Sequence, residues 1–325
     1  MALPLDATLK IGVNTMHRRT EPATGPWLPE IDELVAMVEQ VDRLGYDSFW
    51  CGDHIAMAIP FLDPFLQIAQ AAVASRRLTF GTSVYLLPLR HPAPVAKQVA
   101  TIDHLTQGRF IFGVGIGGEF PKEYEACGVP IKERGARLGE GIEILRKFWT
   151  GETVSHEGRF HKFKDVKMTP PPRQPGGPPI WCGGRQEAAL ERAARLADGW
   201  FSYAVTPDMF AKGLATIEAA ADAAGRKLDR FGTAHLMFTR VGDNYTTALD
   251  EAAEALSVRY AMNMRPAAER YGAIGTPAEV AARIREFHTA GVRHLTLDLV
   301  GPSESRSEQL ERFAAEVKPL LKDLM

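Results

Sequence analysis

Apolar and polar positions follow two alternating patterns along most of this chain. Short apolar runs that end in small or polar residues are typical of buried strands, and longer segments between them repeat apolar residues at helical spacing. In residues 31–45, for example, Leu34 and Val38 recur on one helical face, and Asp63 and Thr276 are placed as N-caps of later helices. The predicted strands are residues 9–14, 47–54, 78–88, 109–115, 179–184, 198–203, 231–241 and 294–300. The predicted helices are residues 31–45, 63–75, 93–108, 133–151, 186–197, 206–225 and 276–291, one that starts near Thr247 and one that ends near Leu321.

The alternation of strands with helices indicates a parallel sheet. Eight such units in a chain of 325 residues favour an α/β fold with a closed (β/α)8 barrel, a TIM barrel, although an open doubly wound sheet can also have eight strands. Residues 153–179 interrupt the alternation, and their pattern predicts an insertion hairpin with a proline-rich return between the fourth and fifth units. We therefore expect residues 1–325 to form a single domain.

Composition narrows the choice of partners. The formal net charge is -2 and no basic stripe is present, so nucleic acid is not an expected partner. No apolar stretch approaches the ~20 residues that cross a membrane, and the N-terminal segment shows no signal-peptide pattern. The cysteines Cys51, Cys127 and Cys182 lie far apart without a C-x-x-C pair, so neither a disulfide nor a metal site is expected. These features predict a cytoplasmic protein that acts on a small molecule.

The octet GVGIGGEF at residues 113–120 matches the dinucleotide-binding pattern G-x-G-x-x-G. That fingerprint requires a helix that begins within the glycines and receives a pyrophosphate on its N-terminal N–H groups. Here Pro121 follows closely, and the next convincing long helix starts only near Arg134. NAD is therefore not the expected cofactor. We interpret the glycines as the open end of the fourth strand, where a flat ring can approach the backbone.

In a barrel, the C-terminal ends of the strands form the active-site face. His54 ends the second strand, and a histidine there can donate or accept a proton, although a purely structural role is the alternative. Gly183 and Gly184 run directly into a helix whose N-terminal N–H groups, together with Arg185, favour a phosphate; an ordinary turn is the alternative. The other strand-end candidates are Asn14, Asp53, Ser83, Val84, Tyr85, Gly115, Gly117, Glu119, Ser202 and Tyr203.

Taken together, these segments resemble the luciferase-like oxidoreductase superfamily, which includes bacterial luciferases, flavin monooxygenases and enzymes of the deazaflavin coenzyme F420. The resemblance lies in DSFWCGDHI (47–55), in residues 78–151 and in PIWCGGRQEAALERAARLADGWF (179–201). It implies a barrel that binds F420 or FMN at the C-terminal ends of its strands. It is more specific for the superfamily than for the cofactor or the substrate.

The resemblance also implies roles for individual positions. Ser83 and Val84 resemble a bulge with a non-proline cis peptide that supports the flavin ring, and Gly183 with Gly184 resembles the segment that binds the cofactor phosphate. His54 resembles the histidine that takes the substrate hydroxyl proton in deazaflavin-dependent alcohol dehydrogenases. The residues assigned to cofactor binding are Asn14, Asp53, Ser83, Val84, Gly115, Gly117, Gly183, Gly184 and Arg185, and those assigned to catalysis are His54 and Glu119.

Two departures from the family pattern concern the substrate. In the sugar-phosphate deazaflavin dehydrogenases a glutamate stands where this chain has Gly118, and Glu119 comes one position later. The aromatic residue expected shortly after His54 is replaced by residues 55–58, with the sequence IAMA. Both departures argue against a sugar phosphate and for a more apolar pocket.

The function that these features favour is F420-dependent hydride transfer to or from a small organic substrate, with His54 handling the proton. The alternative is an FMN-dependent monooxygenase that oxidises an apolar substrate with reduced flavin and O2 and depends on a separate flavin reductase. A barrel that binds flavin without turnover is a third interpretation. The resemblance also implies a homodimer.

Overall fold

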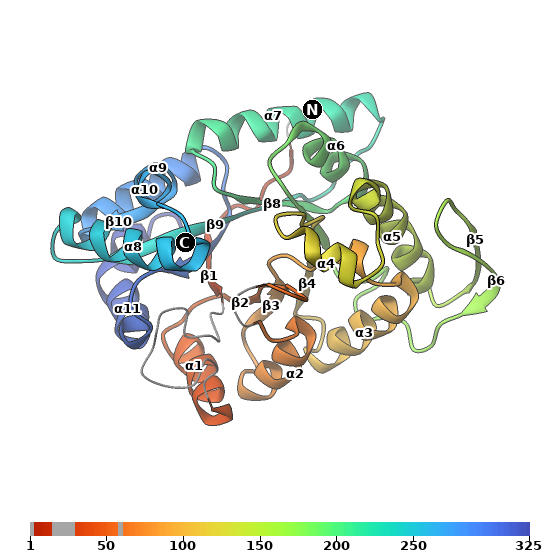
Figure 1. Cartoon of the computed structure of the whole chain (residues 1–325), viewed down its shortest axis with the longest axis horizontal. Coiled ribbons are helices and arrows are strands. Elements are labelled where there is room, and N and C mark those ends of the chain that lie inside the picture. The colour runs from red at the N-terminus through yellow and green to blue at the C-terminus, as the bar shows by residue number, and fades with distance from the viewer. Residues whose placement is uncertain (1–2, 15–29, 58–60) are drawn as a thin grey trace.

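The computed structural model describes residues 3–14, 30–57 and 61–325 of the chain. Eight parallel strands close into a barrel in the order β1, β2, β3, β4, β7, β8, β9 and β11, and β11 pairs back to β1 (Figure 1). The predicted TIM barrel is confirmed. The barrel strands are β1 (Lys10–Asn14), β2 (Ser48–Cys51), β3 (Thr79–Thr82), β4 (Phe110–Val114), β7 (Ile180–Gly183), β8 (Gly199–Tyr203), β9 (Gly232–Val241) and β11 (His294–Leu299).

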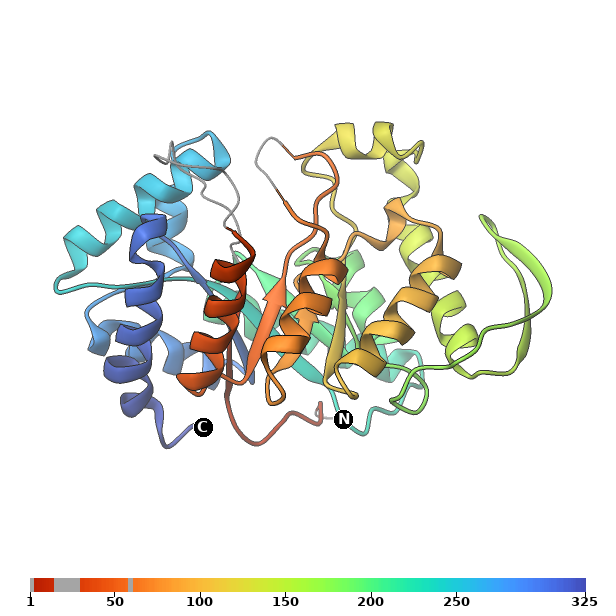
Figure 2. The same cartoon turned by 90° about the horizontal axis from the view of Figure 1, so that it is seen from below.

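Helices surround the barrel and pack their apolar faces against its outer side (Figures 1 and 2). The helices are α1 (Ile31–Arg43), α2 (Pro64–Ala74), α3 (Pro92–Leu105), α4 (Pro121–Ala126), α5 (Arg134–Trp149), α6 (Glu187–Leu196), α7 (Pro207–Ala223), α8 (Tyr245–Tyr260), α9 (Arg265–Tyr271), α10 (Pro277–Thr289) and α11 (Arg306–Arg312).

The two N-cap residues predicted from the sequence, Asp63 and Thr276, make the expected capping hydrogen bonds. The Asp63 carboxylate accepts hydrogen bonds from the N–H groups of Phe65 and Leu66 at the start of α2. Thr276 and Glu279 form a reciprocal capping box at the start of α10. These local side-chain bonds explain why the two helix starts could be placed from the sequence alone.

Three short elements lie outside the predicted pattern. The first turns after the octet form the six-residue helix α4, and α9 is only seven residues long. Strand β10 (Ala273–Gly275) pairs with β9 outside the closed barrel. The last helix continues from α11 as a π-helical turn and a 3-10 turn that ends at Leu321. Elements this short span too few residues to show a period.

The interior of the barrel is filled by an aromatic cluster that contains Trp50, Trp181 and Phe201. The two indole rings stack with centroids 5.6 Å apart. Gly81 provides the space, because a Cβ at that position would lie 2.2 Å from the Trp50 ring. Phe201 and Leu236 belong to this cluster and also line the cavity described below, so the cluster forms the cavity floor.

The predicted insertion between the fourth and fifth units is confirmed. Strands β5 (Thr153–Glu157) and β6 (Lys162–Lys167) form a separate antiparallel hairpin that projects from the barrel beside α5 (Figures 1 and 2). Glu140 of α5 holds the hairpin, since its carboxylate accepts hydrogen bonds from the N–H groups of Phe160 and His161. Within the described ranges, no helix is both long and apolar enough to cross a membrane.

Candidate functional site

A cavity of about 310 Å³ lies at the C-terminal ends of the barrel strands. This volume falls at the lower end of the range of ligand pockets. All eleven residues assigned to cofactor binding or catalysis lie on its wall, although they come from five strands and the segments that follow them. The cavity wall contains Asn14, Asp53, His54, Ser83, Val84, Gly115, Gly117, Glu119, Gly183, Gly184 and Arg185 and, from outside that set, Phe61, Tyr203, Arg259, Tyr260 and Asp298 among others.

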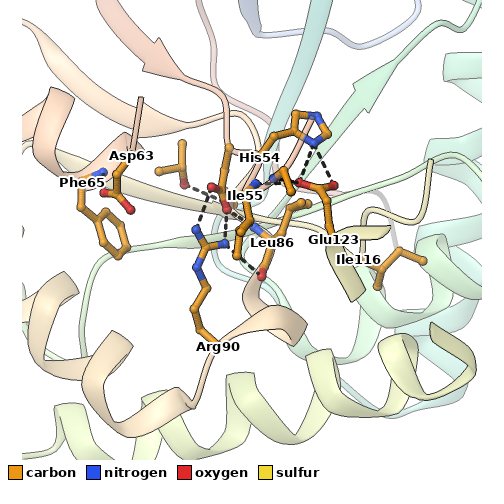
Figure 3. A network of polar contacts seen from close by, with 12 residues as sticks. His54, Ile55, Asp63, Phe65, Leu86, Arg90, Ile116 and Glu123 are labelled. Atoms are coloured by element: carbon orange, nitrogen blue, oxygen red, sulfur yellow. Dashed lines mark hydrogen bonds and ion pairs between the residues drawn. The ribbon is translucent and has the colours of Figure 1, made fainter. Parts of the chain in front are cut away.

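His54 is held by a carboxylate that sequence reasoning did not identify. Its Nδ1 lies 3.0 Å and 3.2 Å from the two carboxylate oxygens of Glu123, and Figure 3 shows the ring and the carboxylate facing each other. The N–H groups of Ile55 and Ala56 donate to the same carboxylate at 2.6 Å and 3.2 Å. The Glu123 side chain is 1% exposed, whereas that of His54 is 17% exposed. Helix α4 thus places a buried acceptor beneath an accessible histidine.

Aromatic rings flank His54 on both sides. The ring of Phe61 contacts it edge to face at a centroid distance of 4.7 Å, and the ring of Phe120 does so at 5.4 Å. The sequence lacks an aromatic residue directly after His54, but the fold supplies two from elsewhere in the chain. Two apolar rings therefore contact the histidine, and the more apolar pocket expected from the sequence stays a prediction.

The carboxylate of Asp53 is committed to structure. Arg90 binds it through both terminal nitrogens, with the Nη2–Oδ1 distance 2.9 Å, and the N–H of Leu86 donates to it at 2.8 Å (Figure 3). The Asp53 side chain is 1% exposed although the residue belongs to the cavity wall. Its assignment to cofactor binding stays a prediction, and its observed partners show that it fixes the segment after β3 against the end of β2.

The non-proline cis peptide implied by the family resemblance is present. The peptide bond between Ser83 and Val84 is cis. Ser83 donates a hydrogen bond from its Oγ to the Oδ1 of Asn14 at 2.7 Å. The Val84 side chain occupies the space that side chains on the neighbouring strands would need, because a Cβ on Gly115 or Gly183 would lie 2.4 Å or 3.1 Å from its methyl groups. These two glycines therefore shape the wall by admitting Val84.

The start of α6 has the features expected of an anion site. Gly184 adopts a φ of +128°, which L side chains rarely adopt, and a Cβ there would lie 2.6 Å from the Cβ of Ala189. In the described part of the chain, the N-cap residue Gln186 makes no side-chain capping bond, so N–H groups of the first turn remain available. Arg185 is exposed and donates from Nη1 to the carbonyl of Ala204 at 2.9 Å, which holds it at the cavity wall.

Glu119 and Glu123 lie in different environments. Glu119 is exposed at the cavity wall, and after burial its charge contributes to raising the pKa of the Tyr260 hydroxyl. Glu123 is the acid that contacts His54. No pattern in the sequence distinguished Glu123 from the other acidic residues of this segment, because its role depends on how α4 folds over the loop after β2.

The cavity wall also carries two tyrosines and an ion pair. Tyr203 ends β8, and its hydroxyl is hydrogen-bonded to that of Tyr260 at the end of α8. Arg259 binds the carboxylate of Asp298 with an Nη1–Oδ2 distance of 2.6 Å, and both side chains are almost fully buried. Burial, followed by the neighbouring phenol, raises the pKa of the Tyr203 hydroxyl well above its usual range, and burial also raises the pKa of Tyr260. Only Tyr203 of these four was a sequence candidate.

The cysteines have no catalytic environment. Burial raises the pKa of the Cys182 thiol to about 12, which keeps it protonated at neutral pH. Among the residues that the structure describes, no group of His, Cys, Asp or Glu has the arrangement of a metal site.

Comparisons with known proteins identify the chain's relatives. The model of the luciferase-like monooxygenase family matches residues 9–294. An uncharacterised protein of Mycobacterium tuberculosis is 40% identical over 167 residues, which cover 51% of this chain and 57% of that protein. The F420-dependent glucose-6-phosphate dehydrogenase of Amycolatopsis mediterranei is 28% identical over 327 residues, which cover 90% of this chain and 95% of that enzyme. The crystal structure of the monooxygenase RslO1 from Streptomyces bottropensis superimposes with a TM-score of 0.83 at 26% identity and covers 96% of this chain and 99% of that one.

Proposed function

Because the chain belongs to the luciferase-like monooxygenase family, we propose that it is a flavin-type oxidoreductase that binds F420 and exchanges a hydride with a small organic substrate. Relatives that use F420 and relatives that are monooxygenases both match this chain over most of its length. The observation that favours hydride transfer is the contact between His54 and the buried Glu123, since it fixes the proton on one nitrogen of the ring.

The hydrogen bonds around Glu123 assign that proton. Glu123 receives two backbone N–H groups and faces Nδ1 of His54, so it acts as an acceptor toward all three. Nδ1 therefore carries a hydrogen in the neutral imidazole, and Nε2 keeps its lone pair. A histidine in this tautomer can take the hydroxyl proton of an alcohol while the carbon loses its hydride, and it can return the proton when a carbonyl is reduced.

The cofactor fits the rest of the wall. When bound, a deazaflavin supplies a ring carbon that accepts or releases a hydride. The Val84 bulge offers an apolar support for its ring, and the backbone at Gly115 and Gly117 offers a side-chain-free approach. The start of α6 with Gly184 and Arg185 would hold its phosphate. The chain's own groups therefore bind and orient the cofactor, and His54 moves the proton.

The second candidate is an FMN-dependent monooxygenase. The likeness to RslO1, at 26% identity over nearly the whole of both chains, favours it. The apolar contacts of His54 with Phe61 and Phe120 would suit an apolar substrate of such an enzyme. In that case a separate flavin reductase would supply reduced FMN. A flavin-binding barrel without turnover is a weaker candidate, because it does not account for an ordered base beside an accessible cavity. For either enzyme we propose that the protein is a cytoplasmic homodimer.

An anaerobic titration separates the two enzymatic functions. The chain is titrated with F420 and with FMN, each oxidised and reduced, and binding is followed by absorbance. We expect F420 to bind more tightly, and the F420-loaded protein to reduce the cofactor with at least one member of an alcohol panel. Tighter binding of reduced FMN, with substrate-dependent O2 uptake, would establish the monooxygenase instead. Saturation by NAD at micromolar concentration without flavin would contradict both.

A further inference from the structure

Four polar side chains on the cavity wall lie outside the arc of strands assigned to the cofactor. The cofactor candidates come from the ends of β1, β2, β3, β4 and β7. Tyr203 ends β8, Arg259 and Tyr260 end the helix after β9, and Asp298 lies on β11. These are the remaining strands of the barrel. We call Tyr203, Arg259, Tyr260 and Asp298 the tyrosine wall.

The tyrosine wall is polar but carries no net charge. Arg259 and Asp298 are 5% and 4% exposed and lie 2.6 Å apart, so each neutralises the other. A buried pair of this kind adds little net stability to a fold, because the loss of hydration offsets its attraction. A phosphate or carboxylate would find no unpaired cation on this wall. The negative charge of Glu119, which lines the same cavity, also opposes an anion.

The two phenols leave one hydrogen for a ligand. Each hydroxyl has one hydrogen, and a single hydrogen bond joins Tyr203 to Tyr260. Whichever hydroxyl donates in that bond, the other keeps its hydrogen. In the described ranges neither hydroxyl has a further protein partner. Because both residues line the cavity, the remaining O–H can point to a ligand there.

We propose that the tyrosine wall is a substrate subsite that binds an uncharged oxygen, of a carbonyl or hydroxyl group, other than the oxygen that lies beside His54. The substrate class is then an uncharged organic molecule with two oxygen functions, one beside His54 and one beside the tyrosines. The Arg259–Asp298 ion pair beside the phenols keeps the subsite neutral and polar. The subsite proposal rests on the proposed function, because it assumes that the cavity holds a substrate beside a bound cofactor.

The test compares three probes of one shape by isothermal titration. Acetophenone has one uncharged carbonyl, para-diacetylbenzene has two at opposite ends, and para-acetylbenzoate replaces the second with a carboxylate. They are titrated into the full-length chain, without cofactor and with the cofactor that binds best. One hydrogen bond to a neutral group corresponds to about a tenfold change in affinity at most. We expect para-diacetylbenzene to bind about five- to tenfold more tightly than acetophenone, and para-acetylbenzoate no more tightly.

The double variant Tyr203→Phe/Tyr260→Phe removes both hydroxyls and leaves no unpaired partner. We expect it to abolish the advantage of para-diacetylbenzene and to keep the wild-type affinity for the cofactor. The control Tyr245→Phe, on an exposed tyrosine at the start of α8, should keep the advantage.

Four results would overturn the proposal: no advantage of para-diacetylbenzene in the wild type, an advantage that survives the double variant, tightest binding of para-acetylbenzoate, or loss of cofactor affinity in the double variant. Because binding needs no turnover, these outcomes are independent of whether the hydride-transfer reaction is found.

Discussion

Replacing Glu123 by glutamine is expected to disable His54 while keeping its position. The two side chains have the same shape, and the amide oxygen can take the place of the carboxylate oxygen that accepts from Ile55 and Ala56 at 2.6 Å and 3.2 Å. The NH2 group then occupies the place of the other oxygen, which lies 3.0 Å from Nδ1 of His54. An amide donor at this shorter distance favours the opposite tautomer, with the hydrogen on Nε2, over the 3.2 Å contact of Nδ1 with the amide oxygen.

The size of the effect follows from these contacts. An Nε2 that already carries a hydrogen cannot take a proton from the substrate. General base catalysis contributes about 10²- to 10⁴-fold to the rate, so we expect kcat to fall at least about 100-fold. KM should change by less than about threefold, because the contacts of the substrate with the rest of the wall remain. The hydrogen bonds of this side chain then involve a neutral amide instead of a charged carboxylate, which lowers the free energy of unfolding by about 1–3 kcal/mol.

Turnover is measured with the alcohol that the wild-type chain oxidises fastest, and the tautomer by nitrogen NMR of the histidine ring. Denaturant unfolding checks that the variant is folded. Glu125→Gln is the matched control, because Glu125 lies on the same helix and pairs at the surface with Lys122. An E123Q variant with wild-type kcat and an unchanged ring spectrum would refute the assignment of His54 as the base.

Three further predictions concern other residues of the chain. His54→Ala should lower turnover about 100-fold and change cofactor affinity by less than about twofold, as measured by steady-state kinetics and by titration; a wild-type rate would remove His54 from the mechanism. Gly184→Ala should weaken cofactor binding about tenfold, because alanine disfavours the φ of +128° at this position and its Cβ would clash with Ala189. An unchanged cofactor affinity would place the phosphate elsewhere. Burial lowers the pKa of His235 to about 3. Between about pH 6.5 and pH 3 the unfolded state therefore binds one proton that the folded state does not. As the pH decreases through this range, the free energy of unfolding decreases by roughly 1 kcal/mol per pH unit. Denaturant unfolding at a series of pH values should show this slope in the wild type and a smaller one in His235→Phe.

The barrel and the location of its site could be predicted because both depend on local pattern. Each strand is marked by its own apolar run, and in a parallel barrel every strand ends at the same face. Residues at the ends of five predicted strands, from Asn14 to Arg185, therefore had to meet around one opening, and the structure brings them there. The same reasoning showed that the octet at residues 113–120 is not a dinucleotide-binding motif, because no long helix begins within it.

What each of these side chains contacts was decided by the tertiary structure alone. His54 and Glu123 are 69 positions apart, and they meet because α4 folds back over the end of β2. Tyr203 and Tyr260 are 57 positions apart and meet because β8 pairs with β9, the strand that α8 follows. The carboxylate of Asp53 is bound by Arg90, 37 positions away, a partner that the sequence did not indicate. The period of a sequence determines which face of an element is buried, but hydrogen-bond partners between distant segments depend on how the elements pack, which no local pattern encodes.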